Sequence, residues 1–364
     1  MASSATVGKI KGSLLGIILH DICEEIRLDE LREILDAKRV RPDFKHATPD
    51  YVRFENSPVV EQLDPIVLSS GDSLQPQIKY YDYGVASVIL ELCFETDWDE
   101  LVKLAARWVP SAELERQAQQ IIRGRLERIA PAIVRPYAEW LSEDYYIFLL
   151  SDVPERPSGA DLLSEHGAEI ADMLRGEAIP LAQSEMQEIL QAGLSYYPND
   201  LVVVGWNAAL VYDEPLGAAT SIQILEYANS QLLEFRHYDE LLTRELAGVY
   251  RSLKHRARFW RRWRMRGEAS RLSSLTVEVT ELVERADTAI KFVSDMFSAR
   301  LYRLAAAKVG VPDYKNLVNE KLRTADGLYR TLIDEFHQSR GFALEVMVVI
   351  ILLIELVYLF RGKY

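Results

Sequence analysis

Cysteine is nearly absent from this chain, and the common motifs of nucleotide and metal chemistry are missing. Cys23 and Cys93 are the only cysteines among 364 residues, so the chain has no disulfide framework and no four-cysteine zinc site. It also has no glycine-rich phosphate loop, no GxSxG motif and no HExxH motif. We therefore predict no cofactor, no metal ion and no enzymatic activity.

Histidine is scarce as well, and its six residues are scattered along the chain. His20, Asp21 and Glu24 lie close together, and we interpret them as solvated polar groups at the end of a strand. His237 and Glu240 lie about one turn apart on a predicted helix, where ion pairing and hydrogen bonding are the expected role. Carboxylates that meet only in the fold are invisible in a sequence, so an enzyme with an unrecognised site in the N-terminal region remains an alternative.

The N-terminus has no long apolar run. The run from Leu14 to Leu19 has six residues, which is too few for the apolar region of a signal peptide. The net charge is −13, which excludes nucleic-acid binding by the bulk charge of the whole chain. The two thiols fit a reducing compartment.

Residues 8–212 mix strand and helix patterns, and we predict that they form an α+β domain. Runs rich in β-branched, aliphatic and aromatic residues predict strands over residues 10–26, 51–60, 65–68, 78–94, 145–150 and 201–212. Gly84 is expected to kink or bulge the fourth of these strands. Helices are expected over residues 28–35, 98–108, 158–175 and 181–192. Asp97 is the expected N-cap of the second helix, and Thr96 is the other candidate.

After Pro215 the pattern becomes helical. Apolar residues recur every three or four positions over residues 218–253 and 272–307. This spacing predicts long helices that form an antiparallel hairpin or coiled coil across residues 218–340. Gly310 and Pro312 predict a turn and a new helix start, from which a third helix runs toward the C-terminus.

The last apolar stretch, residues 342–360, contains seventeen apolar residues out of nineteen. As a helix it spans about 28 Å, close to the roughly 30 Å of a bilayer's hydrocarbon core, so we predict a C-terminal transmembrane helix. Glu345 and Glu355 are the exceptions. Acids inside a span pair with a partner or mark a functional site, and we expect these two to pair within an oligomer. An interfacial or buried helix is the alternative.

The segment from Arg251 to Arg266 is strongly basic and is interleaved with aromatic residues. It has eight Lys or Arg residues and no acid. Anionic lipid attracts such a segment by about 1 kcal/mol per basic residue near the surface, while arginine with aromatic side chains also binds RNA. A solvated loop that pairs with acidic neighbours is a third interpretation. The residues expected to contact a membrane or polyanion are Lys254, Arg256, Arg258, Trp260, Arg261, Arg262, Trp263, Arg264 and Arg266.

Three stretches together resemble the required-for-meiotic-nuclear-division family, a domain-of-unknown-function family. They are Asn319–Leu322 (NEKL) with the later apolar run that ends at Glu355, Tyr81–Val85 (YDYGV), and Ile224–Leu242. Many members of that family carry Arg and Trp beside the first glutamate of the apolar run. This chain differs there, because Phe342, Ala343 and Val346 surround Glu345. The resemblance implies a membrane-attached protein without an established enzymatic activity.

These patterns predict a membrane-anchored scaffold or interaction protein. Its fold class is α+β, with an N-terminal mixed domain over residues 8–212, long antiparallel helices over residues 218–340 and a transmembrane anchor over residues 342–360. We expect a tail-anchored protein with a cytoplasmic body at a bacterial inner membrane, and its expected partners are the bilayer and further copies of the chain bound through helices. A membrane-tethered RNA- or ribosome-binding protein is the alternative.

Overall fold

The structure is a computed structural model that describes residues 9–36, 57–68, 70–177, 179–254, 270–271, 273–274, 276–277, 279–280 and 296–361. The chain divides into two compact units. The first unit comprises Met1–His237 and Ala286–Tyr314, and the second comprises Tyr238–Arg285 and Lys315–Tyr364. The boundary along the chain therefore falls inside two helices.

The first unit is built on a nine-stranded sheet with the order β2-β4-β5-β1-β6-β9-β8-β7, and β3 pairs with β4 off this path. The strands are β1 (Ile10–Ile26), β2 (Val59–Gln62), β3 (Ile66–Val67), β4 (Ser73–Tyr80), β5 (Val85–Thr96), β6 (Ile133–Asp152), β7 (Gly193–Leu194), β8 (Leu201–Val204) and β9 (Ala208–Tyr212). The two longest strands, β1 and β6, pair antiparallel at the centre, whereas β6 and β9 pair in parallel.

Two predicted strands are in fact hairpins. The run expected over residues 78–94 folds back at Gly84, where φ is +92° and the Gly84 amide donates to the carbonyl of Tyr81 at 3.2 Å. The run expected over residues 201–212 turns at Gly205, whose amide donates to Ala208 O at 2.8 Å. A glycine therefore reverses the chain at each of these two turns, where we expected a bulge in one strand and a continuous second strand.

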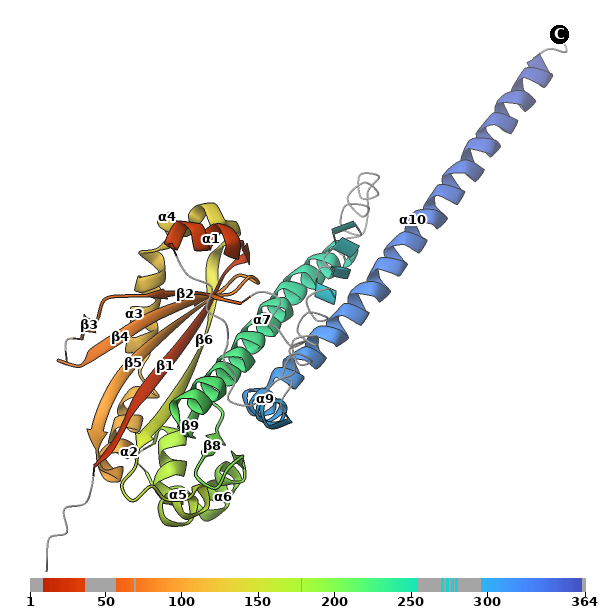
Figure 1. Cartoon of the computed structure of the whole chain (residues 1–364). Coiled ribbons are helices and arrows are strands. Elements are labelled where there is room, and N and C mark those ends of the chain that lie inside the picture. Colours follow the sequence, from red (N-terminus) through yellow and green to blue (C-terminus); the bar gives the residue numbers. More distant parts are fainter. Residues whose placement is uncertain are drawn as a thin grey trace, which may run out of the picture. The chain divides into compact units, whose positions relative to one another are not determined.

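The helices of the first unit cover both faces of the sheet. They are α1 (Leu28–Leu35), α2 (Trp98–Trp108), α3 (Ala112–Arg123), α4 (Leu126–Ile129), α5 (Gly159–Arg175), α6 (Gln183–Leu190), the first part of α7 (Pro215–Lys254) and α9 (Met296–Val309). The bounds predicted for α1 and α2 are confirmed, and the Asp97 carboxylate caps α2 by accepting from Glu100 N at 2.9 Å. Figure 1 shows α7 on the opposite face of the sheet from α2 and α5.

Alternate residues of β1 explain why both faces need cover. Leu14 and Ile18 point into a core that they share with Trp108 and with helices α2, α3 and α5. Ile17 and Leu19, on the other face of the strand, are also fully buried. A central strand that is apolar on both sides is stable only between two layers, so the sequence of β1 itself calls for a second layer on the α7 face.

The second unit pairs the C-terminal part of α7 with α10 (Val311–Arg361). Leu246 packs with Ala325, and Val249 packs with Ile333 further along both helices. The residue numbers rise together, so α7 and α10 run parallel. The chain reaches this arrangement because α9 precedes α10, and Gly310 with φ +92° turns the chain between them.

The predicted transmembrane helix is not supported. No helix among the residues that the structure describes combines the length and the apolar composition that crossing a membrane requires. The expectations of a membrane protein, of a tail anchor and of placement at a bacterial inner membrane are therefore wrong.

Candidate functional site

The buried face of α7 is unusually polar for a helix that packs on a sheet. Seven polar residues of its first half are buried: Thr220, Ser221, Glu226, Asn229, Ser230, Gln231 and Glu234. Glu226, Ser230 and Glu234 are spaced by four residues and so follow one row along the helix surface. Because buried polar groups need partners, this row must be matched by polar groups of the first unit.

Glu226 and Ser230 of that row are matched by side chains from β4 and the β4–β5 turn, and the adjacent Gln231 is matched from α9. Lys79 of β4 forms an ion pair with Glu226, whose side chain is fully buried. The hydroxyls of Tyr83 and Ser230 lie 2.8 Å apart, and the hydroxyl of Tyr302 donates to Gln231. These contacts fix the rotation of α7 about its axis more narrowly than apolar packing does, because each polar pair is satisfied in one register.

Glu234 stands apart from its neighbours on the row. Its residue is 8% exposed, and no hydrogen bond or ion pair to its carboxyl group is found in the described part of the chain. Burial raises the pKa of Glu234 well above its ordinary value, and the nearby charges of Asp21 and Asp82 raise it further. The surroundings of the Glu234 carboxyl therefore favour its protonated form.

Asp21 and His237 meet beside Glu234. Nδ1 of His237 lies 2.6 Å from Oδ2 of Asp21, so one proton lies between the two atoms, and the His237 ring stacks on Tyr137 of β6 at 4.7 Å. Burial raises the pKa of Asp21, and the hydrogen bond from His237 opposes that rise. We call Asp21, Glu234 and His237 the Asp21 cluster.

The Asp21 cluster can store and exchange a proton. It brings two buried carboxyl groups of raised pKa to one imidazole, so the titrations of the two carboxyl groups depend on one another. The burial of Cys23 likewise raises the pKa of its thiol, to about 12. Among the described residues, no group of three or more His, Cys, Asp or Glu side chains is placed to hold a metal ion.

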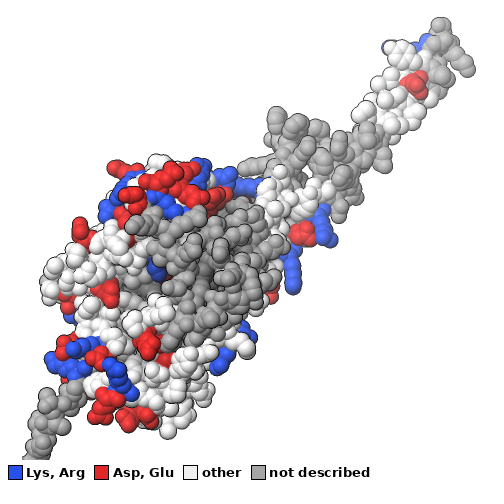
Figure 2. Space-filling view, viewed as in Figure 1, with Lys and Arg blue, Asp and Glu red and all other residues white. Residues whose placement is uncertain are grey.

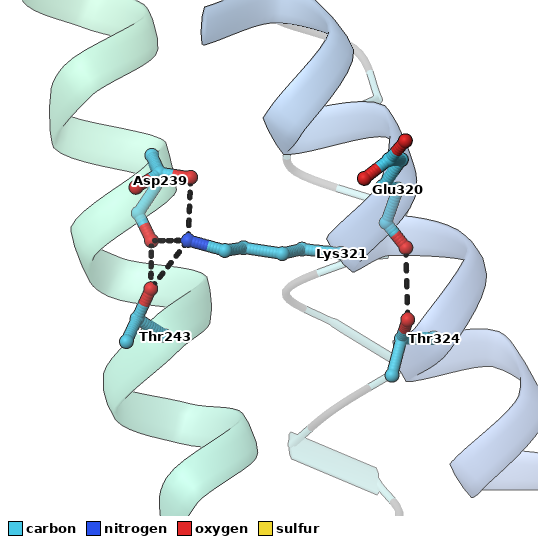
Figure 3. A network of polar contacts seen from close by, with 5 residues as sticks. All are labelled: Asp239, Thr243, Glu320, Lys321 and Thr324. Atoms are coloured by element: carbon cyan, nitrogen blue, oxygen red, sulfur yellow. Dashed lines mark hydrogen bonds and ion pairs between the residues drawn. The ribbon is translucent and has the colours of Figure 1, made fainter.

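A second polar centre joins the two helices of the second unit (Figure 3). The ammonium group of Lys321, from α10, donates to the carboxylate of Asp239 at 2.5 Å and to the Asp239 main-chain carbonyl at 3.2 Å. It also donates to the hydroxyl of Thr243, one turn further along α7, at 2.5 Å. Lys321 belongs to the NEKL stretch, so its role in this structure is to fasten α10 to α7.

Beyond the Lys321 contacts, α10 ends in an exposed apolar segment. Its exposed residues are Met347, Val348, Val349, Ile350, Ile351, Leu352, Leu353, Ile354, Leu356, Val357 and Tyr358, each at least 50% exposed. Figure 2 shows this part of α10 as largely free of charged side chains. We call residues 347–358 the apolar segment. A helix that is apolar on nearly all sides is normally buried, so the exposure of this segment is unusual.

The structure tests few of the residues that the sequence singled out. Of the basic stretch, Lys254 is the last residue of α7, and residues 255–266 lie outside the described residues. The side chain of Glu345 is likewise outside them, while Glu355 is exposed within the apolar segment. Contact of the basic stretch with lipid, RNA or ribosome thus stays a prediction.

The Asp21 cluster was missed because its members are more than two hundred residues apart in the sequence. Asp21 and His237 were each interpreted alone, as a solvated strand end and as a helix-face ion pair. The available signal was the row Glu226, Ser230 and Glu234, where acids interrupt an otherwise apolar helix face. Such an interruption predicts polar partners on the layer beneath.

Comparison with known proteins places the chain in a family. Residues 11–219, more than half of the chain, match the family model described as "Uncharacterized protein MJ0711, N-terminal domain", so the chain belongs to this family. The "Uncharacterized protein MJ0711" of Methanocaldococcus jannaschii is 17% identical over 220 residues, which are 60% of this chain and 66% of that protein. The chain thus spans just under two thirds of the relative it matches. No solved structure matches the chain.

These matches overturn the resemblance drawn from the sequence. The family that matches is that of MJ0711, and nothing points to the required-for-meiotic-nuclear-division family. The three short stretches that suggested it are helix and turn features with structural roles: YDYGV forms the β4–β5 turn, and the lysine of NEKL fastens two helices.

Proposed function

We propose that this member of the MJ0711 family is an interaction protein that assembles with further copies of itself through the apolar segment of α10. The observation that carries the proposal is the exposure of eleven large apolar side chains between Met347 and Tyr358. Soluble proteins rarely expose contiguous apolar patches larger than a few hundred Å². The segment therefore fits an interface that another helix covers.

The energy available for such an interface is large. Fully burying one large apolar side chain stabilises by about 1.5–3 kcal/mol. The side chains of the apolar segment are already about half covered by their own helix, so burying the remainder contributes on the order of 10 kcal/mol per copy. This exceeds the lower estimates of the cost of association, so two or more such helices side by side form a stable contact.

A second copy is the occupant that the composition favours. Among residues 347–358 the single charged residue is Glu355, so the segment has no charge pattern to complement in a different partner. Parallel helix pairing already occurs within the second unit, where Leu246, Val249 and their partners on α10 follow steps of three and four residues. Identical apolar helices in the same direction extend that mode of packing.

Sedimentation velocity of the full chain without detergent, over a hundredfold range of concentration, tests the proposal. We expect a concentration-dependent oligomer for the wild-type protein. The double variant Val349→Asp and Leu353→Asp places two charges one turn apart on one face of the segment. It should shift the protein to a monomer, because burying unpaired carboxylates in the interface is unfavourable.

A matched control distinguishes the segment from general surface effects. Val67, on β3 of the first unit, is 71% exposed, and Val67→Asp makes the same chemical change at another exposed apolar site. It should leave the oligomer unchanged. A wild-type protein that stays monomeric at all concentrations would refute the proposal. So would a protein that binds vesicles of neutral phospholipid through this segment but does not self-associate without them.

A further inference from the structure

We propose that the Asp21 cluster is a proton-operated latch, which holds the end of the first-unit part of α7 on β1 and loosens it as the pH rises. The inference is independent of self-association through α10. It rests on two observations. The cluster lies where α7 leaves the first unit, and the buried Glu234 carboxyl has no hydrogen-bond or ion-pair partner among the described residues.

The position of the latch is defined by the division of the chain. His237 is the last residue of α7 that belongs to the first unit, and the helix continues without interruption to Lys254 in the second. The hydrogen bond between His237 and Asp21 thus joins α7 to β1 at the last residue of the helix that belongs to the first unit.

The groups around the cluster come from four elements. β1 contributes Cys23 and Glu24 besides Asp21, and the β4–β5 turn contributes Asp82 and Tyr83. β6 contributes Tyr137, which stacks on His237, and Arg135, which pairs with Glu24. α7 itself contributes Arg236, which pairs with Glu143 of β6. The two arginines are engaged with other acids, so the charge of Glu234, once formed, has Asp21 and Asp82 as neighbours.

The sign of the effect follows from linkage between proton binding and opening. Glu234 binds its proton more tightly in the closed state than in the open state, where water restores a pKa near 4.5. Between that value and the raised pKa of the closed state, opening releases a proton. The opening equilibrium therefore rises by up to about tenfold per pH unit in this window, and it is independent of pH below about 4.5. The pKa of Asp21 is also raised in the closed state, so its ionisation likewise favours opening as the pH rises.

Native-state hydrogen exchange on the full chain measures this opening directly. Exchange rates of the amides of residues 230–237, corrected for the intrinsic pH dependence of exchange, give the opening equilibrium between pH 5 and pH 8. We expect it to increase with pH by several-fold or more per unit. Glu234→Gln removes the ionisable group while keeping its shape, and it should at least halve the slope.

Two further variants separate a latch from ordinary packing. Glu240→Gln changes an exposed acid on the same helix and should leave the slope unchanged. Asp21→Asn removes the partner of His237, so it should raise the opening equilibrium at pH 5 and also flatten its pH dependence. An opening equilibrium of the wild-type protein that varies less than twofold between pH 5 and pH 8 would overturn the proposal. So would a Glu234→Gln variant with the slope of the wild type.

Discussion

Lys321 of α10 binds Asp239 of α7 twice, through the carboxylate and through the main-chain carbonyl of the same residue. Thr243, four residues on, also donates its hydroxyl to that carbonyl at 2.7 Å and accepts from Lys321 at 2.5 Å. The three groups form a closed set of hydrogen bonds. A partly buried lysine whose ammonium group makes three hydrogen bonds stabilises a fold more than an exposed ion pair does.

Replacing this lysine should loosen the helix pair. Lys321→Met keeps most of the apolar stem and removes the ammonium group, so we expect the pairing of α7 and α10 to lose about 1–2 kcal/mol. Hydrogen exchange of the α7 amides over residues 239–249 measures the loss. Arg330→Met is the matched control, because Arg330 pairs with Asp326 within α10 and its side chain is 75% exposed. Its cost should stay below about 0.5 kcal/mol; equal losses for both variants would contradict the role given to Lys321.

The turn between β4 and β5 should tolerate no side chain at Gly84. Its φ is +92°, and a Cβ atom added there would lie 1.8 Å from the carbonyl oxygen of Cys23 on β1. Gly84→Ala therefore forces main-chain atoms apart, and we expect a loss of more than about 2 kcal/mol in the free energy of unfolding.

Gly71 offers the comparison that separates backbone strain from this clash. Its φ is +90°, nearly the same, but nothing lies within 4 Å of an added Cβ. Gly71→Ala should cost about 1 kcal/mol, the conformational strain alone. Denaturant unfolding followed by circular dichroism compares the two variants, and similar losses would show that the approach of Gly84 to β1 is unimportant.

Secondary structure was readable where one local signal dominated. β1 and α2 follow from uniform composition and from the Asp97 cap, and their predicted bounds agree with the structure. The hairpins at Gly84 and Gly205 were missed because β5, β8 and β9, which adjoin these turns, begin or consist of continuous runs of buried residues. A glycine in such a run is compatible with a bulge or with a reversal, and the choice depends on which strand lies beside it.

The candidate sites depended still more on tertiary structure. The sequence shows that the segment is apolar, but it does not show whether other residues cover it. From the composition alone we predicted a transmembrane helix, which the structure does not support. The Asp21 cluster joins β1 to α7 only because β1 lies at the centre of the sheet and α7 crosses its open face. Neither the strand order nor the rotation of α7 can be derived from spacing along the chain.

His20, the neighbour of Asp21 on β1, points to the other side of the sheet. It is 1% exposed, its ring meets Trp140 edge to face at 5.9 Å, and neither ring nitrogen has a hydrogen-bond partner in the described part of the chain. Burial lowers the pKa of His20 to about 4, although the nearby charge of Glu115 opposes this. The folded protein thus keeps a neutral imidazole that an unfolded chain would protonate below about 6.5.

This burial should make the folded state sensitive to acid. The contribution of His20 is fully present above pH 6.5 and is lost as the pH falls toward 4, because the unfolded state then binds one more proton. Its magnitude is on the order of 3 kcal/mol. The Asp21 cluster acts in the opposite direction above about pH 4.5, so the wild-type profile alone mixes the two effects. The difference in unfolding free energy between wild type and His20→Leu isolates His20, and it should favour the wild type progressively more from pH 4 to pH 6.5 and then level off. A difference that does not change over this range would mean that His20 is protonated in the folded protein or exposed to solvent.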